Sequence, residues 1–165
     1  MEYAVILKAL LFVVALFDGI YFGVLLHELG HGVAALLATR QSISIQVGTS
    51  DRNVSLSMGR LRILLGLAGF RYGATRYDRS RETVGAQRWI IAGGPVASLI
   101  VTVVLGMSLG RLEAWSWIWV ALFALFVANF RILIVSLWPI EYAFPDGNGE
   151  VWLSDGLDFW RVGKR

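Results

Sequence analysis

The chain has 165 residues, of which 56% are hydrophobic and only 16% are charged, and it contains no cysteine. A soluble domain carries about a quarter charged residues, so the composition favours a membrane protein. Without cysteine, disulfides and thiolate metal sites are excluded. The net charge of +3 does not indicate nucleic-acid binding, because most basic residues are arginines gathered between hydrophobic segments. No nucleic-acid partner is expected.

An apolar N-terminal region extends over residues 4–39, which is too long for one upright membrane span of about 20 residues. Three charged residues interrupt it: Lys8, Asp18 and Glu28. Two arrangements fit this pattern. Either one long helix is tilted and kinked near Gly19, or a short first segment precedes the span. In both arrangements we place the first span at about residues 17–38.

The segment 40–88 differs from its neighbours, because polar and apolar residues alternate in two short runs, 42–47 and 53–58. Turn-forming residues separate the runs, as they do between antiparallel strands. We therefore expect a small β hairpin or meander within residues 40–75, at the membrane surface. Its strands can offer an edge to an unwound substrate segment. The segment is too short to add a peptide-binding domain, such as a PDZ domain, beside this sheet.

Two later segments are long and apolar enough to cross a bilayer. Residues 89–110 contain no charge, and residues 115–138 contain only Arg131 and carry tryptophans at both ends. The expected fold class is mainly α, a polytopic membrane protein with three transmembrane helices. We expect one domain over residues 1–165, with a C-terminal tail at 140–165.

Nine arginines lie in the segment 40–88, whereas the connection between the two later spans holds one. The positive-inside rule then places this segment and the C-terminus in the cytoplasm, and the N-terminus outside. We expect an integral, multi-pass protein of the cell membrane.

The residues His27-Glu28-Leu29-Gly30-His31 form an HExxH motif that contains both histidines of the chain. On a helix, positions i and i+4 share one face, so both imidazoles can bind one metal ion with Glu28 beside them. Zinc suits such ligands and leaves a position open for water, whose proton Glu28 can accept. Simple packing explains poorly why three ionisable groups at ligand spacing lie in an apolar segment.

Because there is no third histidine and no cysteine, a further protein ligand must be an aspartate or a glutamate. Asp18 lies nine residues before His27, on the opposite side of a helix, and is discarded. The tail offers Glu141, Asp146, Glu150, Asp155 and Asp158. Among these, Asp146 lies in a Pro-Asp-Gly turn, and Asp155 lies at a predicted helix start with Ser154 as the N-cap. The residues themselves do not choose between these two aspartates.

The second span contains the stretch Gly93-Gly94-Pro95-Val96-Ala97-Ser98. Proline frees helix backbone groups that can hold substrate, and small residues let helices approach closely. Gly93 and Gly94 are therefore candidates for substrate or transition-state contact, with close packing against the first helix as the alternative. Asn129 of the third span is a further candidate for such contact, with hydrogen bonding between helices as its alternative.

These stretches, HELGH at 27–31, GGPVAS at 93–98 and FPDG at 144–147, resemble the site-2 proteases, which are intramembrane zinc metalloproteases. The resemblance implies one zinc ion bound by His27 and His31, with Glu28 as the catalytic glutamate. The third ligand of that family is the aspartate of an Asp-Gly that follows prolines after the last span, which selects Asp146. The long stretch between the prolines keeps Asp155 as an alternative, and Ser136 stands where the family often has an asparagine.

The resemblance thus implies a zinc metalloendopeptidase that cleaves membrane proteins in or near their transmembrane segments. A zinc-activated water would attack the peptide bond, with Glu28 as the general base. The expected partners are a membrane-protein substrate and the lipid bilayer. A non-catalytic membrane adaptor that retains the fold and a metal site is the alternative. The intact Glu28 disfavours it, because a purely structural zinc site needs no base.

Overall fold

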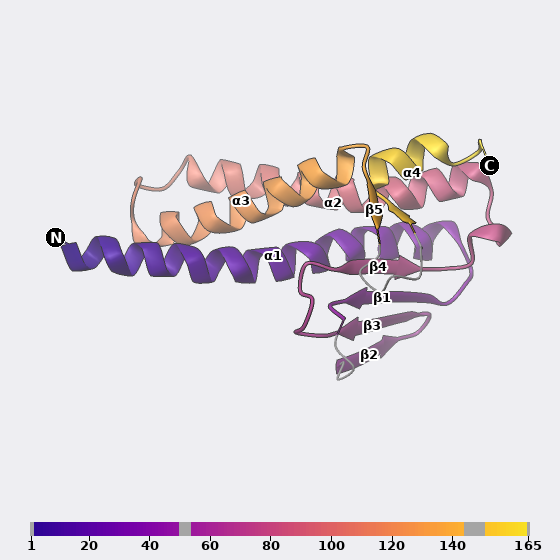
Figure 1. Cartoon of the computed structure of the whole chain (residues 1–165), viewed down its shortest axis with the longest axis horizontal. Helices are drawn as coiled ribbons and strands as arrows, with labels where there is room; N and C mark the ends of the chain where they lie inside the picture. Colours follow the sequence, from indigo (N-terminus) through magenta and orange to yellow (C-terminus); the bar gives the residue numbers. More distant parts are fainter. Residues whose placement is uncertain (1, 50–53, 144–150, 165) are drawn as a thin grey trace.

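The structure is a computed structural model that describes residues 2–49, 54–143 and 151–164. Three long helices lie side by side, and a small sheet and a short helix gather at one end of them (Figure 1). The helices are α1 (Glu2–Ala38), α2 (Val84–Leu109), α3 (Trp117–Leu137) and α4 (Asp155–Arg161), with a 3-10 turn at Arg79–Arg81. The strands are β1 (Ile43–Val47), β2 (Val54–Met58), β3 (Leu61–Leu65), β4 (Gly73–Arg76), β5 (Glu141–Ala143) and β6 (Val151–Leu153).

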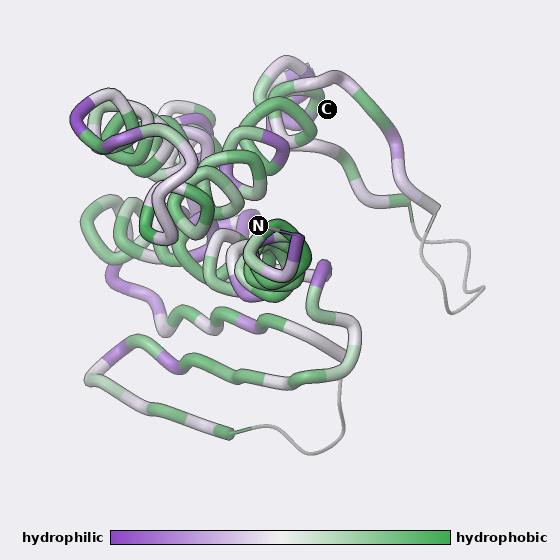
Figure 2. The backbone as a smooth tube through the Cα atoms, turned by 90° about the vertical axis from the view of Figure 1, so that its left-hand side faces the viewer, coloured by the Kyte–Doolittle hydropathy of each residue, from purple (hydrophilic) through white to green (hydrophobic). Residues whose placement is uncertain are grey.

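The helices α1, α2 and α3 are each long and apolar enough to cross a membrane, which confirms the predicted fold class. Hydrophobic residues predominate along all three (Figure 2). Large side chains such as Val5, Ile100 and Ile118 are more than half exposed on their outer faces. An apolar surface of this extent is stable in lipid and not in water.

The N-terminal region is one continuous helix of 37 residues. This decides between the two arrangements that the sequence allowed. At 1.5 Å per residue α1 is about 55 Å long, well beyond a hydrocarbon core of about 30 Å. It therefore tilts or extends out of the bilayer.

Glycines let the backbones of α1 and α2 come into contact. A Cβ atom built on Gly30 would lie 2.3 Å from the carbonyl oxygen of Gly93, and one built on Gly93 would lie 2.5 Å from the carbonyl oxygen of Gly30. No side chain fits between these two turns. The close packing considered for Gly93 is therefore present.

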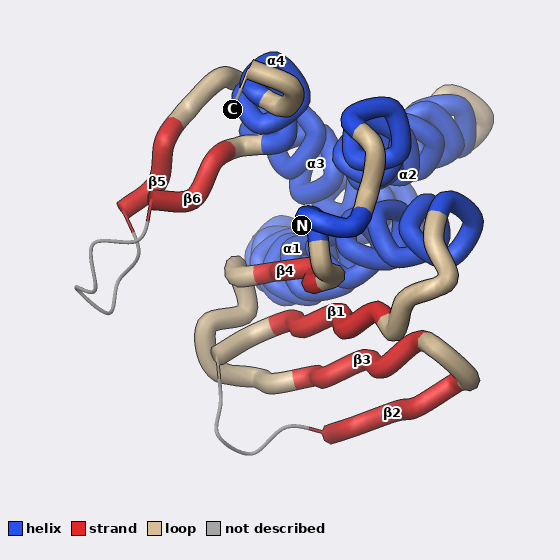
Figure 3. Tube along the Cα trace, turned by 90° about the vertical axis from the view of Figure 1, so that its right-hand side faces the viewer, coloured by secondary structure: helices blue, strands red, loops and turns tan. Residues whose placement is uncertain are grey.

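The strands β1 to β4 form one sheet in the order β2-β3-β1-β4, so a small sheet between the first two spans is confirmed. Its connectivity differs from a simple meander, because β1 pairs in parallel with β3 and antiparallel with β4. The alternate residues Ile43, Ile45 and Val47 of β1 are fully buried, as expected for a strand with one face on a helix. Figure 3 shows β4 beside α1 at the edge of this sheet.

The contact between Gly30 and Gly93 generates a prediction about stability. We expect Gly93→Ala to lower the free energy of unfolding by about 1–3 kcal/mol, because the added methyl group forces two backbones apart. Gly85→Ala, in the first turn of the same helix, is the matched control, since its Cβ would meet only the Thr83 hydroxyl at 4.0 Å. Thermal unfolding in detergent measures both. Equal midpoints for the two variants would contradict the packing described here.

Candidate metal centre

The short helix α4 brings a carboxylate to the two histidines. Ser154 caps this helix, and its hydroxyl accepts a hydrogen bond from the backbone N–H of Leu157. The same residue exchanges two hydrogen bonds with Ile140, just after α3: its backbone N–H donates to the carbonyl, and its hydroxyl accepts from the backbone N–H. These bonds hold Ser154 next to Ile140, and they thereby place Asp155 near the C-terminal end of α3.

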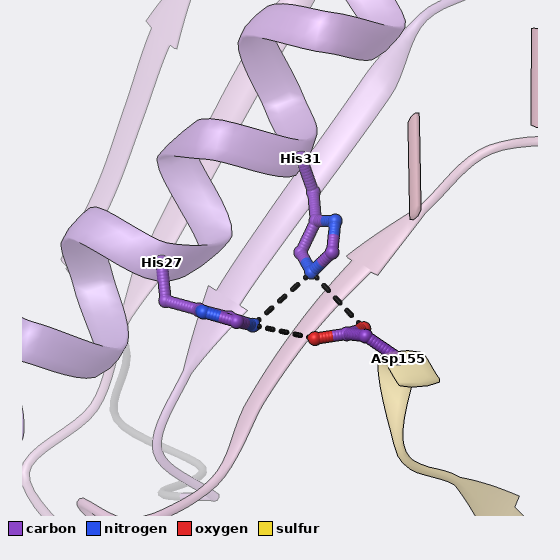
Figure 4. A group of neighbouring side chains, drawn as sticks. All are labelled: His27, His31 and Asp155. Atoms are coloured by element: carbon purple, nitrogen blue, oxygen red, sulfur yellow. Dashed lines mark hydrogen bonds and ion pairs between the residues drawn. The ribbon is translucent and has the colours of Figure 1, made fainter. Parts of the chain in front are cut away.

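Three polar side chains converge between α1 and α4 (Figure 4). The Nε2 atoms of His27 and His31 lie 3.2 Å apart. One carboxylate oxygen of Asp155 lies 2.9 Å from His27 Nε2, and the other lies 3.3 Å from His31 Nε2. Both histidines are buried. Among the described residues, this is the one group of three or more His, Asp or Glu side chains with ligand atoms within 4.8 Å of one another.

The chemistry of these atoms fits a bound cation. His31 Nδ1 lies 2.8 Å from the carbonyl oxygen of Ile90, which can only accept a hydrogen bond. The backbone N–H of Gly94 also approaches Nδ1, but at the longer distance of 3.2 Å. A proton on Nδ1 satisfies the nearer carbonyl, and Nε2 of the neutral ring then presents a lone pair to His27 and Asp155. Lone pairs and a carboxylate that face one another need a proton or a metal ion between them. Tetrahedral zinc holds its nitrogen and oxygen ligands about 3.3 Å apart, close to the spacing found here.

Residues of α2 orient the imidazoles. The Ser98 hydroxyl lies 2.9 Å from Nδ1 of His27, and the Ile90 carbonyl holds His31. Contacts of this kind set the tautomer and the ring orientation of metal-binding histidines. Ser98 is completely buried, so water does not compete for its hydroxyl at this contact.

Gly94 of α2 faces the imidazoles directly. A Cβ atom at this position would lie 2.2 Å from His31 Nε2 and 2.7 Å from His27 Nε2. Any side chain here would occupy the space between the ligand atoms. Of the two glycines singled out in the sequence, Gly94 therefore borders the centre, whereas Gly93 packs against Gly30.

Glu28 is buried against the edge strand β4. Its Oε2 accepts a hydrogen bond of 2.7 Å from the Thr75 hydroxyl. Gly73 of the same strand leaves room for the carboxylate, since a Cβ there would lie 2.6 Å from Oε1. The sheet between α1 and α2 thus holds the glutamate of the HExxH motif in place.

Burial alone would raise the pKa of the Asp155 carboxyl. When no metal ion is bound, protonated imidazoles of His27 and His31 outweigh burial through their hydrogen bonds and charge, and they hold this pKa below its ordinary value. A charged carboxylate at this position can bind a metal cation.

Two other residues singled out in the sequence have different surroundings. Asp146, favoured as third ligand, lies outside the described residues. Asn129 is buried beside Gly23 of α1, and its amide nitrogen donates to the Leu125 carbonyl of its own helix. Its Oδ1 has no hydrogen-bond partner among the residues described. A substrate contact of Asn129 stays a prediction.

An ion pair ties α4 to the chain that follows β4. Arg79 contacts Asp158 at 2.6 Å, and Asp158 is buried, one turn beyond Asp155. Sequence analysis missed Arg79, Thr75 and the role of Ser98. Their residue types are common on surfaces and in helices, and only long-range contacts distinguish them.

The chain matches a known protein family. A family model described as Peptidase M50B-like matches residues 2–140, which include the HExxH motif and all three long helices. The match ends before Asp146 and Asp155. No curated protein matches the chain.

The ion pair between Arg79 and Asp158 generates a prediction about local stability. We expect Arg79→Met to raise amide hydrogen exchange in residues 157–162 about fivefold, which corresponds to about 1 kcal/mol for a partly exposed pair. Arg81→Met is the matched control, since Arg81 pairs with Asp78 at the surface. Unchanged exchange in α4 of the Arg79 variant would show that other contacts alone hold this helix.

Proposed function

We propose that this chain, which belongs to the Peptidase M50B-like family and with it to the site-2 proteases, is an intramembrane zinc endopeptidase. Membership of this family makes it a membrane metalloprotease. His27, His31 and Asp155 would hold the ion. The observation that carries this proposal is the approach of Asp155 to within 2.9 Å of a histidine 128 positions earlier in the chain. The family match includes both histidines. Helix α4, which lies beyond the matched residues, supplies the carboxylate of Asp155 as a further candidate ligand.

A zinc ion in this centre supplies a Lewis acid, which polarises a peptide carbonyl and lowers the pKa of water to about 7. Glu28 acts as the general base: it accepts the proton released from water and delivers it to the departing amine. Thr75 orients the carboxylate of Glu28. Ser98 and the Ile90 carbonyl keep Nδ1 of each imidazole engaged, so that each Nε2 would be available to hold the ion.

The position of the centre along α1 supports cleavage near one face of the bilayer. Lys8 donates to the Trp115 carbonyl and lies over the ring of Trp117, a combination typical of the membrane interface. His27 follows nineteen residues later, about 28 Å along the helix. This nearly equals the hydrocarbon thickness of about 30 Å, so the centre lies toward the opposite interface, on the side of the sheet.

The orientation of the chain is part of the proposal. The arginines of segment 40–88 lie on the side of the sheet, which by the positive-inside rule is the cytoplasmic side of the cell membrane. The N-terminus is then outside. The substrate would be a membrane protein, cut in or near a transmembrane segment at this cytoplasmic end.

The edge strand β4 offers a way to hold an unwound substrate. Among the described strands β4 pairs only with β1, and its Thr75 contacts Glu28. A substrate segment added to the free edge would run past the general base in extended form. Peptide bonds are accessible to hydrolysis in that form and not in an intact helix.

The proposed mechanism predicts that Glu28→Gln abolishes hydrolysis and leaves the metal in place. We expect cleavage to fall by at least about 10²–10⁴-fold, the usual contribution of a general base. Suitable substrates are tagged single-span proteins of varied transmembrane sequence, reconstituted with the protease in liposomes. Glu113→Gln, in the connection between α2 and α3, should cleave as the wild type does. Undiminished cleavage by the Glu28 variant would refute this mechanism, and no cleavage by wild-type protein with bound zinc would favour the adaptor.

The assignment of the third ligand predicts a difference between two alanine variants. We expect Asp155→Ala to weaken zinc binding by more than about 100-fold, whereas Asp146→Ala keeps the wild-type affinity. Zinc content after purification and competition with a chelator measure both. The reverse result would identify Asp146 as the third ligand. Wild-type protein that binds no zinc would refute the proposed chemistry.

A further inference from the structure

A groove of about 380 Å³ opens between α2 and α3 at the start of α4. Its walls are almost entirely apolar, and they include Ile91, Pro95 and Leu99 of α2, Leu133 and Leu137 of α3, and Phe159 of α4. The volume is at the small end of the range for ligand pockets, which begins at about 300 Å³. It suits one or two side chains and is too small for a folded partner.

The groove is continuous with the candidate metal centre. Asp155 lines the groove and also contacts both histidines. Of the described residues that line the groove, Asp155 alone is charged. A group bound in the groove therefore lies against Asp155, whose carboxylate also contacts His27 and His31.

The groove is open toward lipid. Ile91, Pro95 and Leu99 follow one another at intervals of four residues, so they form one face of α2 that runs along the helix. Leu99 and Leu137 are about half exposed on the outside of the helix bundle. A transmembrane segment in the bilayer can thus reach this groove sideways, without passing through water.

Two of the residues that line the groove are small, Ala92 and Gly156. Gly156 cannot carry a side chain, because a Cβ there would lie 2.1 Å from the carbonyl oxygen of Leu137. Pro95 has no N–H to donate to the carbonyl of Ile91, so this turn can accept a hydrogen bond from another chain.

We propose that this groove binds the side chain of the substrate residue next to the scissile bond, and that it selects a bulky aliphatic or aromatic residue there. The inference rests on the proposed protease function. A large apolar side chain fills the groove, whereas a polar one would be buried without a partner. Ala92 is the residue that determines the permitted size.

The test uses wild-type protein in liposomes and a single-span substrate that it cleaves. The cleavage site is located by mass spectrometry, and the two flanking residues are changed in turn to Ala, Leu, Phe and Asp. At the position that occupies the groove, we expect kcat/KM to be about 10–100-fold higher with Leu or Phe than with Ala, and lowest with Asp. Equal rates for Ala and Leu at both positions would overturn the proposal.

The variant Ala92→Phe fills the groove and should lower the ratio of Leu to Ala cleavage at least about tenfold, with zinc content unchanged. Val103→Phe, on the exposed part of α2 beyond the groove, should keep the wild-type ratio. If Ala92→Phe does not fold, Leu137→Ala enlarges the groove and should shift the preference from Leu toward Phe. If the groove holds a lipid acyl chain instead of a substrate side chain, Ala92→Phe should change cleavage of the Leu and Ala substrates by the same factor. An unchanged ratio of Leu to Ala cleavage in this variant would refute the proposal. Loss of all cleavage in the wild type would instead count against the protease function.

Discussion

The structure of this protein depends on the meeting of two imidazoles and one carboxylate in apolar surroundings. His27 and His31 are buried on α1, and Asp155 reaches them from α4. Each of these groups costs free energy to bury alone. Together they satisfy one another with a proton or a metal ion between them, because the Ile90 carbonyl turns a lone pair of His31 toward His27 and Asp155. The same contacts therefore determine how α4 packs on the membrane helices and which ligand atoms the centre presents.

Close approach of backbones makes this meeting possible. The turns at Gly30 and Gly93 touch, so α2 can supply Ser98 and the Ile90 carbonyl to the imidazoles. Gly156 does the same for α4 against the end of α3. Helices in lipid associate through such small residues, because lipid provides no hydrophobic force between them. The space left beside these contacts is the groove between α2 and α3.

The small sheet has a part in the centre as well as at the surface. Strand β4 places Thr75 on the carboxylate of Glu28, and the following turn places Arg79 on Asp158 of α4. One short stretch of chain thus supports both the base and the helix that carries the third candidate ligand. In the proposed function the free edge of the same strand receives substrate, which would couple substrate binding to the position of the general base.

The amino-acid sequence by itself determined the membrane class, the three spans, a small sheet and the HExxH motif, because hydropathy and helical spacing are local properties. It left one helix or two at the N-terminus open, and its residues did not choose between Asp155 and Asp146. The resemblance to the site-2 proteases favoured Asp146, which lies outside the described residues. Only the tertiary structure brought Asp155 to the histidines, since that contact depends on how Ser154 pairs with Ile140 and how α4 packs. Thr75, Ser98 and Arg79 likewise acquired their roles through contacts between distant segments, which no local pattern specifies.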